Sequence, residues 1–374
     1  MNKICVITTT RAEYGIMSRL INKLNEDADI DFSLVVSGAH LSKKFGETYK
    51  EISVPIVKKI DIEIEKSPAH SMALTLEKFD KFFKKLNPDI VVLLGDRYET
   101  MAIAIAAMLN NIPIAHLHGG ETTEGAIDEA IRHSITKMSY IHFTSCEEYR
   151  KRVIQLGENP ERVFNVGSLG VENIKTVSLM KKEQLEASLG LKFGVKNILV
   201  TFHPVTLEKG LAKMQVKELI SALNELKDTN IIITMPNSDA ESDEISKQIC
   251  EFEKENKNVY TFKSLGMLRY LSTLQYVDMV VGNSSSGIIE VPSFKIPTVN
   301  IGDRQKGRIQ AKSVINCYSK KEDILQAISE GYNLDCSDVV NPYEGKNTLE
   351  QIVKIIKDVT SNEIHLQKSF YNID

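Results

Sequence analysis

The stretch Val91-Val-Leu-Leu-Gly95-Asp96-Arg97 decides how this chain folds. A short run of branched apolar residues that ends in a glycine and a carboxylate is typical of a strand that is buried on both faces. Similar Ile- and Val-rich runs recur along the chain and alternate with longer stretches of helical period. That alternation is expected when parallel strands are joined by crossover helices, so the sequence predicts an α/β protein.

Outward from this run, the first half offers candidate strands at Ile4–Thr8, Phe32–Val36, Ile90–Leu94, Pro113–His118, Ile141–Thr144 and Val163–Val166. Helical periodicity lies between them at Ile16–Leu24, Leu74–Leu86, Met101–Leu109 and Ile127–Met138. After a Lys/Glu/Ser/Gly-rich pause at 167–195, new candidate strands begin at Ile198, Ile231, Val259, Met279 and Thr298. We therefore expect two Rossmann-like domains, 1–170 and 171–374, with the last helix near 349–359 packing on either of them.

Composition excludes several classes of protein. The net charge is −4, so no overall basic field exists to hold nucleic acid or an anionic membrane. Hydrophobic residues make up 42%, which is ordinary for a globular protein, and no apolar run is long enough to span a membrane. The first apolar run is too short for a signal peptide. The 5 cysteines are scattered without a C-x-x-C pair, which fits the reduced cytoplasm.

Two strand ends in the first half carry single candidate residues. Arg11 lies in the turn after the first strand, where it can meet an anion beside a helix N-terminus or can be a surface residue next to a helix cap. Asp96 is either a helix cap or a carboxylate that faces a ligand cleft. Neither G-x-G-x-x-G nor G-x-x-x-x-G-K-[ST] follows the first strand, so neither a dinucleotide fingerprint nor a P-loop is supported.

The densest group of reactive side chains surrounds a Gly-Gly turn and contains four acids and three histidines. Its members are His116, His118, Glu121, Glu124, Asp128, Glu129 and His133. We interpret this concentration as functional. Zinc bound by the three histidines is the alternative, although H-x-H beside Gly-Gly is a weak metal signal. Asp128 and Arg132 are four residues apart, so an ion pair on one helix face is the simpler explanation for these two.

The second half carries groups that suit an anion. In Val280-Val-Gly282-Asn283-Ser284-Ser285-Ser286-Gly287-Ile-Ile-Glu290, a strand is followed by a Gly/Ser turn and a helix, which offers N–H and hydroxyl donors to a diphosphate. Glu290 lies where a carboxylate can bind a ribose diol, whereas a plain serine N-cap is the simpler alternative. His203 ends an earlier strand, and Arg304, Lys306 and Arg308 follow a later one as a second anion-binding cluster.

These segments together resemble the hydrolysing UDP-N-acetylglucosamine 2-epimerases of bacterial sialic acid biosynthesis. The motifs that carry the resemblance are Thr10-Arg11-Ala12-Glu13-Tyr14-Gly15, Gly95-Asp96-Arg97, His118-Gly-Gly-Glu121, Ile131-Arg132-His133-Ser-Ile-Thr-Lys137, His203-Pro204-Val-Thr, Gly282-Asn283-Ser284-Ser285-Ser286-Gly287 and Gly302-Asp303-Arg304-Gln305. They occur in the family's order and cover most of the chain.

The resemblance implies the GT-B architecture, in which two Rossmann-like domains face each other across a cleft that holds UDP, without a metal, NAD or other cofactor. It implies that Asp96 and Asp128 are catalytic carboxylates and that His203 is a catalytic histidine near the diphosphate. The UDP-contacting residues that it implies are Arg11, Ser285, Ser286, Glu290 and Arg304, and Asn237 resembles another polar residue of the cleft. We also expect Arg132, Ser284 and Gly287 to bind substrate. Many members of the family carry Glu where this chain has His118, so either Glu121 or His118 itself is expected to do the work of that carboxylate.

The chemistry of such a reaction makes matching demands. The C2 proton of a 2-acetamido sugar has no adjacent carbonyl, so departure of UDP from C1 must make it removable, through a glycal to which water then adds. Acids near C2 and fixed donors on the diphosphate are required. Alternatives with the same nucleotide site are epimerases of 2,4-diacetamido-2,4,6-trideoxy sugars in legionaminic acid pathways, a non-hydrolysing epimerase, a GT-B glycosyltransferase and a non-catalytic nucleotide-sugar-binding regulator. A cytoplasmic homodimer or homotetramer is expected.

Overall fold

The computed structural model describes residues 1–124, 126–205, 208, 210–236 and 241–373. The chain divides into two compact units, each assembled from separate stretches of sequence. The first unit comprises Met1–Glu121, Asp128–Asn173 and Tyr343–Asp374, and the second comprises Thr122–Ile127 and Ile174–Pro342. The polypeptide therefore passes between the units at four points, after Glu121, Ile127, Asn173 and Pro342.

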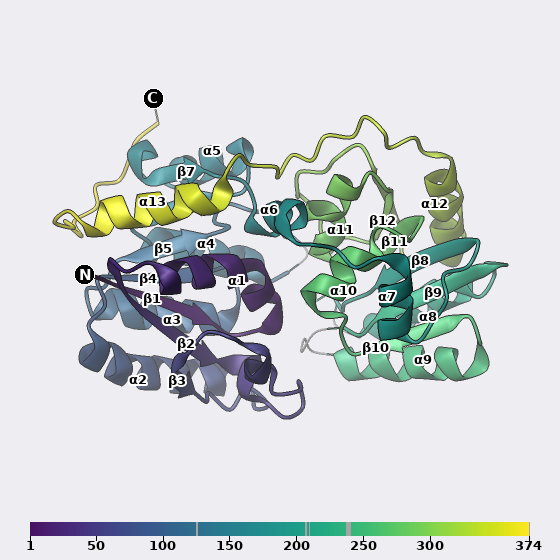
Figure 1. Cartoon of the computed structure of the whole chain (residues 1–374), viewed down its shortest axis with the longest axis horizontal. Helices are drawn as coiled ribbons and strands as arrows, with labels where there is room; N and C mark the ends of the chain where they lie inside the picture. The colour runs from purple at the N-terminus through teal and green to yellow at the C-terminus, as the bar shows by residue number, and fades with distance from the viewer. Residues whose placement is uncertain (125, 206–207, 209, 237–240, 374) are drawn as a thin grey trace. The chain divides into compact units, whose positions relative to one another are not determined.

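The first unit is built on a 7-stranded parallel sheet (Figure 1). Its spatial order is β3 (Ile56–Ile60), β2 (Ile30–Ser37), β1 (Asn2–Thr8), β4 (Ile90–Leu94), β5 (Ile114–Leu117), β6 (Ile141–Thr144) and β7 (Val163–Asn165). The connecting helices are α1 (Arg11–Glu26), α2 (Pro68–Leu86), α3 (Tyr98–Leu109), α4 (Asp128–Met138) and α5 (Glu147–Gln155), with 3₁₀ turns η1 (Gly38–Leu41), η2 (Thr48–Glu51) and η3 (Pro160–Arg162). Helix α6 (Leu169–Thr176) leads out of this unit.

Strand β1 explains why the runs in the sequence are continuously apolar. Ile4 and Val6 belong to one buried cluster of side chains, whereas Cys5 and Ile7 belong to another. Because successive side chains of a strand point to opposite faces, a sheet that is covered on both faces needs apolar residues at every position. Helix α13 (Thr348–Thr360, yellow in Figure 1) packs beside α1 in this unit and contributes its apolar face to the first of these clusters.

The second unit repeats the plan with a 6-stranded parallel sheet. Its order is β10 (Val259–Phe262), β9 (Thr229–Thr234), β8 (Lys196–Thr201), β11 (Met279–Gly282), β12 (Thr298–Ile301) and β13 (Val314–Cys317). Its helices are α7 (Lys182–Leu189), α8 (Ala212–Leu223), α9 (Ser242–Glu255), α10 (Gly266–Thr273), α11 (Ser285–Ile289) and α12 (Lys321–Asn333), with the 3₁₀ turn η4 (Val291–Phe294).

The predicted α/β class with two parallel sheets is confirmed, and each candidate strand is present. Two strands, β3 and β13, were not predicted from the sequence, and each lies at an edge of its sheet. Val57, Lys58 and Lys59 of β3 are exposed, as is Asn316 of β13, so these edge strands lack the apolar run on which the analysis relied. The second stretch of the first unit ends at Asn173, and the expected domain boundary was at residue 170.

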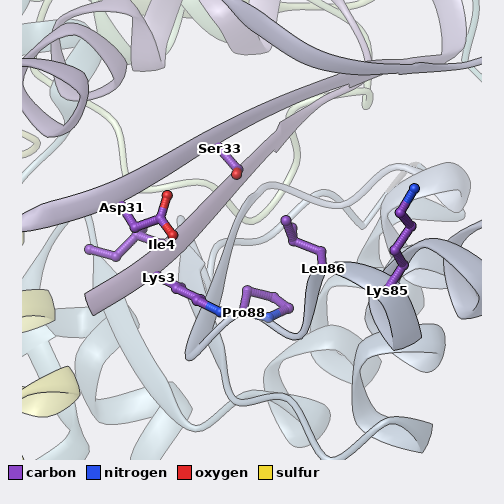
Figure 2. Close-up of a pocket in the computed structure, with 7 residues that line it drawn as sticks. All are labelled: Lys3, Ile4, Asp31, Ser33, Lys85, Leu86 and Pro88. Carbon is purple, nitrogen blue, oxygen red and sulfur yellow. The ribbon is translucent and has the colours of Figure 1, made fainter. Parts of the chain in front are cut away.

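In both sheets the strand order reverses beside the first strand, between β1 and β4 and between β8 and β11. Open α/β sheets bind ligands at the carboxyl ends of the strands beside such a reversal. A cavity of about 120 Å³ lies instead at the amino ends of β1 and β2, lined by Lys3, Ile4, Asp31, Ser33, Lys85, Leu86 and Pro88 (Figure 2). None of the candidate residues lines it. Within the described part of the chain, no helix is long and apolar enough to cross a membrane.

The chain beyond α13 is anchored to the first unit by a buried carboxylate. Glu158 accepts hydrogen bonds from Lys137 Nζ at 2.6 Å, from His142 Nε2 at 3.0 Å and from Lys368 Nζ at 2.5 Å. Tyr371 N also donates to Gly157 O at 2.9 Å. The C-terminal segment is therefore part of the packed fold.

Replacing Glu158 by Gln is expected to lower the free energy of unfolding near pH 7 by roughly 3–5 kcal/mol, because the buried His142 ring and the ammonium groups of Lys137 and Lys368 lose the buried carboxylate that accepts their bonds. Burial alone would raise the pKa of Glu158, but the bonds from His142, Lys137 and Lys368 outweigh it and lower the pKa to about 2. A lowered pKa means stability that is present above the ordinary value of about 4.3 and is lost as pH falls toward about 2.

Urea unfolding of the wild type and of Glu158→Gln between about pH 7 and about pH 3 measures this effect. The difference in their free energies of unfolding should shrink at the acidic end. Lys354→Met, at an exposed position of α13, is the control and should change stability by less than about 0.5 kcal/mol. A Glu158→Gln variant as stable as this control would contradict the assignment.

Candidate functional site

The turn after β1 is organised by Glu13. Thr10 is the N-cap of α1, and its hydroxyl accepts from Glu13 N at 3.3 Å. The Glu13 carboxylate reaches back to Thr9, accepting from its N at 2.7 Å and from its Oγ1 at 2.9 Å. Burial raises the pKa of Glu13 to about 7, against the opposing attraction of Arg97. Arg11 at the same turn is half-buried and lies 3.7 Å from Glu51 Oε1.

The turn after β4 places Asp96 against a buried arginine. Arg97, not Asp96, is the N-cap of α3, so Asp96 is not the cap of that helix. Its carboxylate instead forms an ion pair with the guanidinium of Arg132, which is 1% exposed. Arg132 also binds Glu129 Oε2 at 3.1 Å and donates to the main-chain oxygen of Glu121 at 2.9 Å. One guanidinium thus joins the β4 turn, the Gly-Gly-Glu turn and helix α4.

His118 and Glu121 are brought together at the end of β5. His118 Nδ1 lies 2.8 Å from Glu121 Oε1, and Ser145 Oγ, after β6, donates to the same oxygen at 2.8 Å. Both side chains of the pair are largely buried, with 12% and 4% exposed. Asp128 is the first residue of α4 and is half-buried.

The other two histidines of the predicted cluster have separate partners. His116 is fully buried, with Nε2 at 2.8 Å from Gly95 O and Nδ1 at 3.3 Å from Thr136 Oγ1. Burial lowers the pKa of His116 to about 3, so its ring is neutral and structural. His133 Nε2 contacts Glu129 Oε1 at 3.1 Å. Among the residues that the structure describes, no three His, Cys, Asp or Glu side chains are placed to hold a metal ion.

In the second unit, Asn283 fixes the main chain of His203. Asn283 Oδ1 accepts from His203 N at 2.7 Å, and its Nδ2 donates to His203 O at 2.8 Å. Both residues are buried. The preceding Gly282 has φ +139°, and a Cβ there would lie 2.0 Å from Thr201 O, so only glycine lets β11 and β8 approach this closely.

The serine turn after β11 begins α11 as a cap. Ser284 is the N-cap, and its hydroxyl accepts from Ser286 N at 3.4 Å. The Ser286 hydroxyl is hydrogen-bonded to the phenol of Tyr270, whose pKa is raised by burial. A Cβ on Gly287 would lie 2.8 Å from Thr298 Cγ2, so this glycine allows close packing of the turn on β12. The three serines are half-buried.

The cationic segment after β12 is attached to the same turn. Arg304 donates to Asn283 O at 3.2 Å, and Gln305 Nε2 donates to that oxygen at 2.9 Å. Arg304 and Glu290 are half-buried. Asn237, which was also expected to bind substrate, lies outside the described residues.

Sequence reasoning treated the stretch from His116 to His133 as one group, but the structure divides it. Thr122–Ile127 belongs to the second unit, where Glu124 N donates to Lys306 O at 3.2 Å. Gly307 has φ +83°, and a Cβ there would lie 2.8 Å from Glu124 Oε1.

Four residues of the two sites were missed or given no role: Glu13, Ser145, Tyr270 and Asn283. Thr10-Arg-Ala-Glu13 has the spacing of a capping box, a signal that identifies Glu13 from sequence. No local signal marks Ser145 or Tyr270, because their partners lie 24 and 16 residues away.

Replacing Asn283 by Ala is expected to destabilise the protein by roughly 2–4 kcal/mol, since a buried N–H and a buried C=O of His203 both lose their partner. Asn333→Ala is the matched control, because its amide makes a bond to Ser329 O at an exposed position and its loss should cost less than about 0.5 kcal/mol. Urea unfolding measures both, and equal stability of the two variants would refute the anchoring role.

Comparison with known proteins agrees with this architecture. The family profile described as UDP-N-acetylglucosamine 2-epimerase matches residues 22–357. The chain is 44% identical to the polysialic acid biosynthesis protein P7 of Escherichia coli, over 100% of this chain and 98% of the relative. It is 42% identical to the GDP/UDP-N,N'-diacetylbacillosamine 2-epimerase (hydrolyzing) of Campylobacter jejuni, over 88% of this chain and 87% of the relative.

A solved structure shares the fold. The crystal structure of UDP-GlcNAc 2-epimerase from Neisseria meningitidis bound to UDP-GlcNAc superimposes with a TM-score of 0.81 at 17% identity, over 95% of this chain and 100% of that one. With the profile match spanning most of the sequence, the conclusion is that the chain belongs to the UDP-N-acetylglucosamine 2-epimerase family.

Proposed function

We propose that the chain hydrolyses UDP-N-acetylglucosamine with inversion at C2, releasing N-acetylmannosamine and UDP as the first step of sialic acid biosynthesis. The observation that carries the proposal is that reactive side chains gather where the strand order reverses in both sheets. Acids and a histidine follow β4 and β5, and groups suited to an anion follow β11 and β12. The likeness to the E. coli polysialic acid biosynthesis protein supports the pathway.

The reaction requires that the C1–O bond to UDP break while the C2 proton leaves. As UDP departs, positive charge grows on the ring and makes the C2–H bond acidic enough for a side chain to deprotonate it. The electron pair of that bond forms a C1–C2 double bond, which erases the stereocentre at C2. A proton then adds to C2 from the opposite face and water adds at C1, which gives the free epimerised sugar.

In this proposal the first unit supplies proton transfer and one nucleotide-binding residue, Arg11, and the second unit supplies the other groups that hold the nucleotide. Asp96 and Asp128 are the carboxylates that act at the sugar, and the ion pair with Arg132 fixes the position of Asp96. The diphosphate and ribose are bound by Arg11, His203, Ser284, Ser285, Ser286, Gly287, Glu290 and Arg304. Asn283 supports this set by fixing His203 and by accepting the bond from Arg304.

A second substrate is favoured by a specific observation. The Campylobacter relative named for diacetylbacillosamine is 42% identical to this chain, nearly as similar as the E. coli protein. The same elimination and hydration apply to a UDP- or GDP-linked 2,4-diacetamido-2,4,6-trideoxyhexose, since the chemistry involves only C1 and C2. Groups that contact C4 and C6 of the sugar decide between the two substrates.

Two further properties belong to the proposal. The chain acts in the cytoplasm, where nucleotide sugars are made, and it assembles as a homodimer or homotetramer. Light scattering after size-exclusion chromatography measures the assembly directly.

Incubation with UDP-N-acetylglucosamine in D2O, followed by proton NMR, tests the function. We expect UDP, free N-acetylmannosamine and deuterium at C2, without any acceptor sugar. A glycosyltransferase would release UDP only with an acceptor, and a non-hydrolysing epimerase would return UDP-N-acetylmannosamine. Parallel reactions with UDP- and GDP-linked N,N'-diacetylbacillosamine identify the preferred substrate, and no UDP or GDP from any of the three nucleotide sugars would refute the proposal.

Asp96→Asn and Asp128→Asn are each expected to lower turnover by about two to four powers of ten, the range for loss of a general acid or base, while UDP still binds. Calorimetry with UDP verifies that the nucleotide site is intact. Turnover near that of the wild type in both variants would remove these carboxylates from the mechanism.

The double variant Ser285→Ala, Arg304→Ala is expected to behave in the opposite way, because it removes a hydroxyl and a cation from the proposed diphosphate site. UDP affinity should fall by about tenfold or more, as expected when a charge-assisted hydrogen bond is lost. Lys346→Ala, at an exposed position in the first unit, is the control. Unchanged UDP affinity in the double variant would contradict the proposed nucleotide site.

A further inference from the structure

His118 has an unusual backbone conformation at the carboxyl end of β5. Its φ is +64°, in the left-handed region that side chains other than glycine seldom occupy, and Gly119 and Gly120 follow it. The conformation is held from outside, because His118 N donates to Phe143 O on the neighbouring strand at 2.9 Å. Conformations of this kind persist at functional sites when the surrounding structure imposes them.

The partners of the ring determine which nitrogen carries the proton. A carboxylate only accepts hydrogen bonds, so Glu121 Oε1, 2.8 Å from His118 Nδ1, requires a hydrogen on Nδ1. The Ser145 hydroxyl donates to the same oxygen at 2.8 Å and holds the carboxylate in place. In a neutral imidazole with a hydrogen on Nδ1, Nε2 bears the lone pair.

Within the part of the chain that the structure describes, this lone pair has no partner. His118 Nε2 is buried and has no hydrogen-bond partner among the described residues. His116 differs, because both of its ring nitrogens have partners. His133 and His142 also leave one nitrogen unpaired, but it is Nδ1, the nitrogen nearer their own main chain. His118 therefore combines an unpaired distal nitrogen with a place at the strand ends where ligands bind.

Glu121 is itself held at both its side chain and its main chain. Ser145 binds its carboxylate, and Arg132 donates to its main-chain oxygen at 2.9 Å. The carboxylate is 4% exposed. A buried, doubly held carboxylate behind a histidine fixes both the orientation of the ring and its tautomer, as in other enzymes that use histidine as a base.

We propose that Nε2 of His118 accepts the C2 proton of the sugar, and that Glu121 and Ser145 are positioning residues that act through His118. This inference rests on the proposed function. In the step, the C2–H electron pair forms the C1–C2 double bond, the C1–O pair leaves with UDP, and the proton ends on Nε2. The imidazolium that results faces Glu121, whose charge stabilises it. Asp96, engaged by Arg132, and Asp128 remain for the later proton transfer and for the water.

The tautomer can be measured without turnover. Nitrogen NMR of protein labelled with 15N-histidine, with His118→Gln used to assign the signal, should show a hydrogen on Nδ1 and none on Nε2. Glu121→Gln brings an amide that can donate to Nδ1, so the hydrogen should move to Nε2 in that variant. A wild-type His118 with its hydrogen on Nε2 would overturn the proposal.

Kinetics provide the second measurement. His118→Gln should lower kcat by about two to four powers of ten while UDP binding by calorimetry is kept. His118→Glu restores a proton acceptor at the same place and should recover part of that loss. In the pH profile of kcat/KM, the fall on the acidic side should lie about two pH units lower for His118→Glu than for the wild type, because glutamate ordinarily titrates that far below histidine.

Ser145→Ala should lower kcat about tenfold with little change in KM, because the substrate does not contact Ser145 in this proposal. Ser134→Ala is the matched control, since that hydroxyl bonds only to Ala130 O of its own helix among the described contacts, and it should have no effect.

The outcomes separate the two proposals. If the wild type releases UDP and His118→Gln does so within about threefold of it, the role of His118 is wrong and the proposed function stands. If the wild type releases neither UDP nor GDP from any of these nucleotide sugars, both proposals fall. If Glu121→Gln or Ser145→Ala leaves kcat and KM as little changed as the control Ser134→Ala does, the positioning role is wrong.

Discussion

One buried cation determines the arrangement of the acids in the first unit. Arg132 is almost completely removed from water, and its charge is balanced by Asp96 and Glu129 while it also binds the Glu121 carbonyl. Removing a charge from water is costly unless it is paired and hydrogen-bonded, so these partners cannot be lost singly. The planar guanidinium has five donors in a fixed geometry, whereas a lysine ammonium could not hold three separate segments in this way.

Around His203 the second unit reaches a similar precision with neutral hydrogen bonds. There an asparagine amide pairs with both main-chain groups of His203, and a glycine allows β11 to approach β8. Arg304 is joined to this turn by a bond to the main-chain oxygen of Asn283. The contrast fits the division of chemistry that we propose, with acids set in place by a cation in one unit and an anion site built on amides and hydroxyls in the other.

Most of the fold was predictable because the buried strands are uniformly apolar. Val91–Leu94 is readable for this reason, whereas Lys58 and Lys59 of β3 are not, since an edge strand exposes side chains that loops also carry. The positions of Asp96 and His203 at strand ends were also predictable, because strand ends in parallel sheets are where polar side chains meet ligands.

The contacts within the site were not predictable to the same degree. The simple helix-face explanation paired Arg132 with Asp128, whereas the structure shows an ion pair with Asp96, which is 36 residues away. Ser145 reaches Glu121 across 24 residues, so its role depends on the alignment of two neighbouring strands and not on a local pattern. Thr122–Ile127 likewise belongs to the second unit, where Thr122 and Glu124 lie close to Gly307. No residue spacing in the first half of the sequence indicates this contact.

The interleaved segments of the units also bear on how the chain folds as it is synthesised. Translation delivers the second unit complete once Pro342 has emerged, but the first unit still lacks Tyr343–Asp374 at that moment. Leu349, Ile352, Val353 and Ile356 belong to the apolar cluster beneath α1, so nascent strands made at the outset have an uncovered face until α13 leaves the ribosome. The part of the protein that is made first is therefore the last to be finished, and its exposed sheet is where a chaperone would bind during synthesis.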